Sequence, residues 1–165
     1  MRDKVSEARV VLLHPSIRAE VKRLIEQAED GFPPSMAIRI VQGLRTIAEQ
    51  DALYAQGRTK PGNKVTNAKG GSSFHNYGLA IDFAILTDTD GNGSYNDLSW
   101  DIKRDNDKDG VADWLEVVKI FEAAGWEWGG KWATLTDNPH LQKTFGYTWQ
   151  QLFEKVKRGE EYVSL

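Results

Sequence analysis

The chain has 165 residues, 40% of them hydrophobic, and its 24 acidic and 21 basic side chains leave a net charge of −3. This length supports one domain with a sizeable core, and the scattered basic residues argue against a nucleic-acid partner. Because the chain contains no cysteine, disulfides and thiol catalysis are excluded, and any metal must be held by nitrogen and oxygen ligands.

The N-terminal segment carries charges and a single four-residue apolar run at residues 10–13. That run is far shorter than the apolar core of a signal sequence or a membrane span. We therefore expect a protein that is made in the cytoplasm without a signal peptide and that has no membrane partner.

Helical and strand patterns alternate along the chain without an internal repeat, which predicts a single-domain α+β fold. Apolar residues at helical spacing predict a helix over residues 15–28, and the alternating segment 36–43 predicts a strand. Thr46 and Glu49 have the spacing of a capping box, which opens a predicted helix that ends near Gln56.

Residues 57–73 are rich in Gly, Lys, Asn and Ser and predict a long loop, a feature that is often functional in a compact domain. The later elements are predicted from apolar runs, helical spacing and glycine stops. They are a strand over residues 79–86, a helix over 112–125, a short aromatic strand and turn over 126–132, and a last helix over 148–159.

The stretch SSFHNYGLAIDF places His75 seven residues before Asp82, a carboxylate inside an otherwise apolar strand. Burying a carboxylate is costly unless hydrogen bonds, an arginine or a metal compensate for its lost hydration. With His140 of TDNPHLQ, these residues would make a three-ligand site whose fourth position is open to water, as in hydrolytic zinc centres.

This arrangement requires His75 to lie in the loop before the strand and Gly78 to turn the chain. The same spacing also suits polar core residues that are satisfied by hydrogen bonds, so this alternative stays open on the residues alone. The third histidine, His14, precedes a proline at a helix start and is expected to be a surface or capping residue without a functional role.

Two ordered motifs of the chain resemble those of a known enzyme family. SSFHNYGLAIDF matches SxHxxGxAxD, and WGGKWATLTDNPHLQ resembles WGGxW…DxPHxQ, both typical of VanX/VanY-type zinc D,D-peptidases and of their L-alanyl-D-glutamate peptidase branch, which includes phage endolysins. The segment from QGLRT to GGSS is similar to the family's approach to the first histidine. The resemblance covers roughly residues 36–145, and it implies a small antiparallel sheet flanked by helices, as in hedgehog and D,D-peptidase domains.

The resemblance implies that His75, Asp82 and His140 bind Zn²⁺ and that Asp137 is the catalytic carboxylate. Zinc would lower the pKa of a water toward 7, and Asp137 would take its proton and later pass it to the leaving nitrogen. The alternative for Asp137 is a turn or cap residue, because Asp-Asn-Pro is also ordinary turn chemistry.

Further residues occupy motif positions around the expected cleft. Arg45 matches the family arginine that contacts substrate and helps to stabilise the oxyanion, although a surface pair with Glu49 is the alternative. Gln50, Arg58 and Ser73 are predicted to bind substrate or lie near the cleft, Ser73 as a hydrogen-bond donor. The tryptophans of WEWGGKW either wall the cleft or pack in the core: Trp126, Trp128 and Trp132.

Residues 105–116, DNDKDGVADWLE, match the EF-hand calcium loop D-x-D-x-D-G-x₅-E. The predicted calcium ligands are Asp105, Asp107, Asp109, Asp113 and Glu116. The upstream loop at 88–97 begins in the same way but has Ser99 where the bidentate glutamate belongs, so it is a weaker site or a turn.

Both loops lie in an acidic insertion at residues 86–113, with eight Asp against three Lys or Arg. A bound cation would relieve their repulsion, whereas the alternative is a solvated acidic loop without an ion. Because the insertion links the strand of Asp82 to the helix before WEWGGKW, we expect calcium to order the cleft and activity to depend on it.

The predicted function is that of a monomeric, endolysin-like zinc peptidase, a single catalytic domain over residues 1–165. It would hydrolyse the L-Ala–D-Glu bond of the peptidoglycan stem peptide and act on the cell wall after release from the cytoplasm. The choice of bond rests on the resemblance, since Asp137 stands where the D-alanyl-D-alanine branch has a glutamate. The alternatives are a D-alanyl-D-alanine carboxypeptidase or dipeptidase, a non-catalytic zinc- and calcium-binding module, an acidic calcium-binding interaction protein without zinc, and, for its location, a cytoplasmic recycling enzyme.

Overall fold

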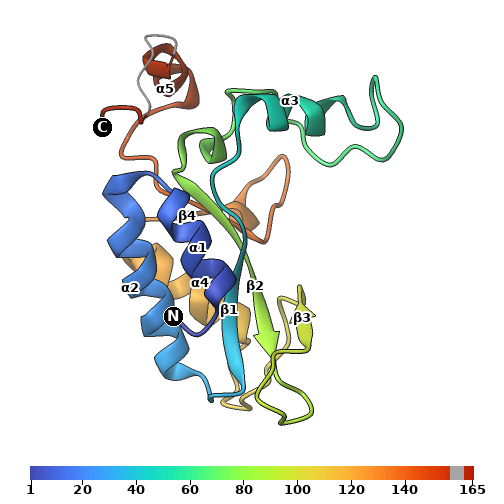
Figure 1. Cartoon of the computed structure of the whole chain (residues 1–165), viewed down its shortest axis with the longest axis vertical. Helices are drawn as coiled ribbons and strands as arrows, with labels where there is room; N and C mark the ends of the chain where they lie inside the picture. The colour runs from blue at the N-terminus through green and yellow to red at the C-terminus, as the bar shows by residue number, and fades with distance from the viewer. Residues whose placement is uncertain (157–161) are drawn as a thin grey trace.

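The computed structural model describes residues 1–156 and 162–165. The helices in these residues are α1 (Lys4–Leu12), α2 (Pro15–Gly31), α3 (Ile47–Ala55), α4 (Asp113–Ala123) and α5 (Trp149–Val156), with short 3-10 helices η1 (Phe74–Tyr77) and η2 (Gly129–Lys131). The strands are β1 (Met36–Gln42), β2 (Ala80–Thr87), β3 (Asp97–Ser99), β4 (Glu127–Trp128) and β5 (His140–Gln142) (Figure 1).

The strands form one antiparallel sheet with β2 at its centre. β1 runs along one edge of β2, and the other edge pairs first with β5 and then with β3. β4 pairs with β5, which gives the strand order β1-β2-β5-β4. This topology places Asp82 of β2 directly opposite His140 of β5.

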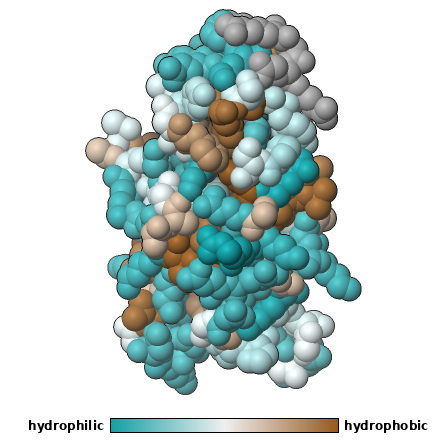
Figure 2. Space-filling model, turned by 90° about the vertical axis from the view of Figure 1, so that its left-hand side faces the viewer, coloured by the Kyte–Doolittle hydropathy of each residue, from teal (hydrophilic) through white to brown (hydrophobic). Residues whose placement is uncertain are grey.

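Helices cover the sheet and bury its central strand. Every residue of β2 except Asp82 is buried, which accounts for its nearly continuous apolar sequence. Helices α1, α2 and α4 contact the sheet, and α2 also packs against α1 and α4. The molecular face on the side of α2 is mostly hydrophilic, as an amphipathic helix requires (Figure 2). The chain thus forms the predicted α+β fold around a small antiparallel sheet.

The long predicted elements are confirmed, including the capping box between Thr46 and Glu49 at the start of α3. The sequence patterns do not predict α1, β3 or β5. α1 buries only Ser6 and Val10, so it lacks an apolar stripe, and β3 and β5 are too short to show alternation. The end of the predicted helix 148–159 lies partly outside the described residues.

His14 is a helix cap, as expected, but it is not a surface residue. Its Nδ1 accepts from the backbone N–H of Ser16, and its Nε2 lies 2.8 Å from the carbonyl oxygen of Val163. The side chain is buried because the C-terminal segment covers it, a tertiary contact that the local sequence does not reveal. None of the described helices combines the length and apolarity needed to cross a bilayer.

Candidate active site and metal centre

Three elements bring the predicted zinc ligands together. Asp82 lies on β2, His140 faces it from β5, and His75 lies in η1, just before β2. Oδ1 of Asp82 is 3.1 Å from Nε2 of His75 and 3.2 Å from Nδ1 of His140, and one ligand atom of each residue lies within 4.8 Å of the others. Two imidazole nitrogens and one carboxylate oxygen are a donor set that fits zinc.

The turn before β2 depends on Gly78, as the sequence predicts. Gly78 has a φ of +66°, and a Cβ at this position would lie 2.7 Å from the backbone nitrogen of His14. Only glycine combines this left-handed conformation with such close approach. Because of this turn, His75 lies outside strand β2 and its side chain faces Asp82.

The other ring nitrogen of His75 is also fixed by the fold. Its Nδ1 lies 2.8 Å from the carbonyl oxygen of Gly43, which can only accept a hydrogen bond. Nδ1 therefore carries the proton and Nε2 keeps its lone pair for a metal. A metal ligand requires this tautomer.

The two histidines control the charge of Asp82. Burial is the largest influence on the pKa of Asp82 and would raise it. The imidazole rings of His75 and His140 beside it outweigh burial and hold the pKa of Asp82 well below its usual range. Asp82 is thus an ionised carboxylate, as a metal ligand must be.

Asp137 lies in the same cleft, in the turn that leads into β5. Burial, followed by the negative charge of Asp82, raises the pKa of its carboxyl group. Its carboxylate accepts no hydrogen bond from the described residues, since the turn is held by the backbone N–H groups of Asp137 and His140. The alternative of a capping residue is therefore wrong, and the carboxylate is available for proton transfer.

The turn carrying Asp137 is held from outside by two tryptophans. The indole N–H groups of Trp128 and Trp114 both donate to the carbonyl oxygen of Asn138, at 2.8 Å and 3.3 Å. Among the tryptophans of WEWGGKW, Trp126 is buried in the core, whereas Trp132 lines the cleft with its ring 5.0 Å from that of His140. Only one of the three therefore walls the cleft.

Gly129 has a role that the sequence analysis missed. A Cβ on Gly129 would lie 2.5 Å from the carbonyl oxygen of Asp137 and 3.1 Å from the Cβ of His140. The absence of a side chain lets the turn pack against η2. The repeated glycine in WGGKW is the sequence signal that could have indicated this contact.

Arg45 points into the cleft. Its Nη2 is 3.9 Å from Oδ2 of Asp82, and its Nη1 donates to Oε1 of Gln50 at 2.9 Å. The Glu49 carboxylate bonds the backbone and hydroxyl of Thr46 in the capping box, and these bonds, followed by the charge of Arg45, lower its pKa. Among the described residues, the ion pair of Arg45 is made with Asp82 and not with Glu49.

Two predicted substrate-binding residues lie elsewhere. Gln50 is fully buried and spans from Arg45 to the carbonyl oxygen of Ala68, so it positions Arg45 rather than substrate. Arg58 stacks 3.9 Å from the ring centroid of Tyr54 and is not among the cleft-lining residues. Both side chains belong to the support of the long loop, an arrangement that depends on tertiary packing.

The cleft around these groups has a volume of about 700 Å³, within the usual range of ligand pockets. Polar groups gather at the ligands, and Ser73 lines the cleft as predicted. Apolar side chains line much of the remainder: Leu53, Val65, Phe74, Trp132, Leu135 and Trp149. Such a cleft can hold a peptide segment with its scissile bond beside Asp137.

Comparisons with known proteins agree with this geometry. A peptidase M15 family model, described as D-alanyl-D-alanine carboxypeptidase, matches residues 66–143. The peptidoglycan L-alanyl-D-glutamate endopeptidase CwlK of Bacillus subtilis (strain 168) is 46% identical over 130 residues, which are 79% of this chain and 72% of CwlK. This chain belongs to the M15 peptidase family.

The fold of this M15 peptidase is also that of a solved relative. The crystal structure of the Serratia marcescens L-Ala D-Glu endopeptidase ChiX matches it with a TM-score of 0.53 and 26% identity, over 86% of this chain and 88% of ChiX. The residues matched by the family model include all three candidate ligands and Asp137. The resemblance noted in the two motifs is therefore confirmed, and the chain is a metallopeptidase of this family.

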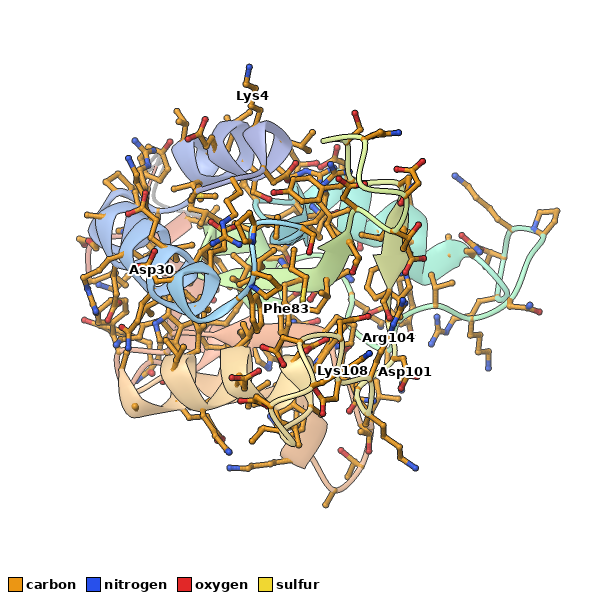
Figure 3. All side chains as sticks on the ribbon, turned by 90° about the horizontal axis from the view of Figure 1, so that it is seen from below. Lys4, Asp30, Phe83, Asp101, Arg104 and Lys108 are labelled. Carbon is orange, nitrogen blue, oxygen red and sulfur yellow. The ribbon has the colours of Figure 1, made fainter. Side chains whose placement is uncertain are left out.

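The acidic loop of the M15 peptidase also groups its predicted ligands. Carboxylate oxygens of Asp105, Asp107 and Asp113 lie within 4.8 Å of one another, as do those of Asp107, Asp109 and Glu116. The two groups share Asp107. Figure 3 shows the basic side chains Arg104 and Lys108 near the same corner of the molecule.

Glu116 is the least satisfied member of this loop. Its Oε2 is buried without a hydrogen-bond partner among the described residues. Burial and then the charges of Asp109, Asp107 and Asp113 raise the pKa of Glu116 to about 7. The positive charge of Lys119 lowers this pKa but does not offset the burial and the acidic neighbours.

The upstream loop is arranged as a turn. Both carboxylate oxygens of Asp88 accept from backbone N–H groups, those of Gly91 and Gly93. In the described residues this loop contains no group of three converging carboxylates or histidines. Of the two predictions for it, the turn is the one that the geometry supports.

Proposed function

We propose that this M15 peptidase is a zinc-dependent peptidoglycan hydrolase that cleaves the L-Ala–D-Glu bond of the stem peptide. The observation that carries the proposal is the convergence of His75, Asp82, His140 and Asp137 in one cleft of a chain 46% identical to CwlK. The name of ChiX specifies the same bond. Asp137, rather than a glutamate, at the catalytic position also favours this branch.

The residues of the cleft divide the work of amide hydrolysis. When bound, a zinc ion supplies the Lewis acidity that makes a water nucleophilic near neutral pH. Asp137 takes the proton of that water on its carboxylate and then delivers it to the leaving amine nitrogen. The raised pKa of Asp137 favours both steps, because a group that acts as base and then acid works best near the operating pH.

Arg45 supports the developing negative charge on the carbonyl oxygen. Its guanidinium is held beside Asp82 by Gln50, so its donors are oriented before substrate arrives. A preorganised donor of this kind contributes roughly 3 kcal/mol to transition-state stabilisation in comparable sites. Trp132 and the other apolar lining residues exclude water from the substrate segment.

The test is mass spectrometry of purified peptidoglycan digested by the zinc-loaded protein, the chelated protein and the Asp137→Asn variant. We expect new N-terminal D-Glu ends with the zinc-loaded protein alone. Release of D-Ala would instead establish the second candidate, a D-alanyl-D-alanine carboxypeptidase, which the matched family model names. Absence of cleavage by a protein that retains zinc would support a non-catalytic metal-binding module.

We also propose that residues 105–116 bind calcium and that this binding supports activity. The supporting observations are the two ligand groups that share Asp107 and the unpartnered buried oxygen of Glu116. Trp114, which directly follows Asp113, connects the loop to the active site. Trp114 stacks 4.4 Å from Phe83, the neighbour of Asp82, and donates to Asn138 beside Asp137.

Calorimetric titration of the zinc-loaded protein with calcium tests this site. Glu116→Gln should abolish the binding heat and lower peptidoglycan hydrolysis, whereas Glu7→Gln, on the exposed surface of α1, should change neither. Calcium binding that survives Glu116→Gln would place the ion elsewhere. Full activity without calcium would contradict the functional link.

We propose, finally, that the enzyme acts as a monomer on the cell wall outside the cytoplasm, where peptidoglycan lies. Light scattering during size-exclusion chromatography tests the monomer. Loss of turbidity when the protein is added to bacteria with accessible walls tests the site of action. A dimer, or walls that resist the protein although isolated stem peptides are cleaved, would contradict the respective proposal.

A further inference from the structure

His140 can bind a metal through Nδ1 only if its ring proton lies on Nε2. A neutral imidazole has one N–H and one lone pair, and the partner at the other nitrogen decides which atom carries the proton. For His140 two neighbours favour different positions of the ring proton. On one side, Nδ1 lies 3.2 Å from a carboxylate oxygen of Asp82. Without a metal, that oxygen favours a proton on Nδ1, which is the tautomer that cannot bind zinc.

A chain of hydrogen bonds leads from the opposite side of the ring to the protein surface. Nε2 of His140 lies 3.0 Å from Oε1 of Gln142, and Nε2 of Gln142 donates to Oε2 of Glu127 at 2.9 Å. Gln142 follows His140 by two positions on β5, so both side chains lie on one face of the strand. Glu127 faces Gln142 across the β4–β5 pair.

The donors and acceptors along this chain allow one arrangement. A carboxylate can only accept, so Glu127 orients the NH₂ end of the Gln142 amide toward itself. The carbonyl end of Gln142 then faces His140 and must receive a proton from Nε2. The proton is thereby kept on Nε2, and the lone pair of Nδ1 points toward Asp82 and the metal position.

We propose that Gln142 and Glu127 are positioning residues that set the metal-binding tautomer of His140. This inference rests on the proposed function, since it takes His140 to be a zinc ligand. Gln142 is buried and His140 is buried beside it, so water does not replace the amide. Thr144 donates to the second oxygen of Glu127 at 3.2 Å and helps to hold that carboxylate in place.

The decisive variant is Glu127→Lys, which replaces an acceptor-only group with a donor-only group at an exposed position. The lysine would attract the carbonyl end of Gln142 and turn its NH₂ toward His140. Nε2 would then accept, and the ring proton would move to Nδ1. We expect zinc affinity to fall by about 10- to 100-fold, the usual effect of losing such a partner.

A second change should restore the tautomer. In the double variant Glu127→Lys with Gln142→Glu, the carboxylate at position 142 accepts from the lysine and from Nε2 of His140. Zinc affinity should recover most of the loss, which a merely structural role of Gln142 does not predict. Glu7→Lys makes the same charge change at an exposed position of α1 without touching Gln142, and it should leave zinc affinity unchanged within about threefold, as expected of an exposed charge in salt.

The readouts are the imidazole nitrogen shifts of the metal-free protein, measured where the rings are neutral, and zinc affinity by chelator competition. The chain has three histidines, so the spectrum can be assigned by single substitutions. The wild type and the double variant should carry the His140 proton on Nε2, and Glu127→Lys should carry it on Nδ1. A proton that stays on Nε2 in Glu127→Lys, or affinity that falls equally in Glu7→Lys, would overturn the proposal.

These results are separable from the proposed hydrolysis. A wild-type protein that cleaves no peptidoglycan, although Glu127→Lys moves the His140 proton, would contradict the function and leave the positioning role intact. A wild-type protein that cleaves the L-Ala–D-Glu bond, with no proton shift in Glu127→Lys, would contradict the positioning role alone. Thermal unfolding of every variant controls for loss of the fold.

Discussion

Replacing Gly129 with alanine should disable the active site without altering any ligand or catalytic residue. The added Cβ would lie 2.5 Å from the carbonyl oxygen of Asp137 and 3.1 Å from the Cβ atoms of Asp137 and His140. Cβ contacts essentially never come closer than 3.0 Å, so the turn has to retreat by about half an ångström or more. The turn that moves carries both the catalytic carboxylate of Asp137 and the candidate metal ligand His140.

The magnitude follows from the sensitivity of catalysis to geometry. A misplacement of about 1 Å costs on the order of 100-fold in rate, so we expect kcat to fall by roughly 10- to 100-fold. Overpacking should also lower the free energy of unfolding by about 1–3 kcal/mol. Zinc affinity should weaken as well, because the added Cβ displaces the Cβ of His140 and with it the imidazole that would bind the metal.

The assay combines initial rates of peptidoglycan hydrolysis at saturating zinc with urea unfolding. Gly31→Ala is the matched control, because a Cβ at Gly31 meets no atom within 4 Å and the position has no positive φ. That variant should match the wild type in rate. A Gly129→Ala protein that is folded and retains kcat within about threefold of wild type would refute the reasoning, because a displaced turn should cost far more.

Three further changes test other parts of the site. Asp137→Asn should retain zinc, measured by atomic absorption, while kcat falls by about 100- to 10,000-fold because the amide cannot carry the proton; an undiminished kcat would contradict the assigned role. Gln50→Leu removes the hydrogen-bond partner of Arg45 Nη1 and of the Ala68 carbonyl, so urea unfolding should show a loss of roughly 1–3 kcal/mol together with a lower kcat, and unchanged values for both would contradict the role of Gln50. Glu116 has a folded pKa of about 7, above its ordinary value of 4.5, so its contribution to stability is complete below pH 4.5 and is lost as pH rises through 7. In the absence of calcium, melting temperatures from pH 5 to 8 should therefore decline less in Glu116→Gln than in wild type, and parallel curves would contradict the raised pKa.

The local pattern of apolar residues in the sequence predicted the helices and strands that form the core. β2 could be recognised because its burial on both faces leaves an apolar run, and α2 because one face of it carries buried apolar residues. α1 has no such stripe and is tied down by tertiary contacts instead, such as the ion pair of Asp3 with Arg39 at 2.9 Å. The three-residue strand β5 forms because it pairs with β2, so the sequence around it carries no pattern that predicts a strand.

The same division holds within the active site. Motif spacing identified His75, Asp82 and His140, and the fold brings them together. The spacing could not separate groups that face substrate from groups that hold them: Gln50 occupies a motif position but is buried behind Arg45. The link from Glu127 to His140 depends on the register of β4 against β5, which the sequence does not reveal.

The turn at residues 137–140 is where these separate supports meet. Its backbone packs into the space left by Gly129, and its Asn138 carbonyl accepts from the indoles of Trp114 and Trp128. The end of the turn is fixed by the pairing of His140 with Asp82. Because these contacts come from α4, β4, η2 and β2, the position of Asp137 is set before substrate binds, which is the condition for efficient proton transfer. Trp114 lies within the acidic loop, between the predicted calcium ligands Asp113 and Glu116, so ordering that loop would act on the catalytic turn directly rather than through a general gain in stability.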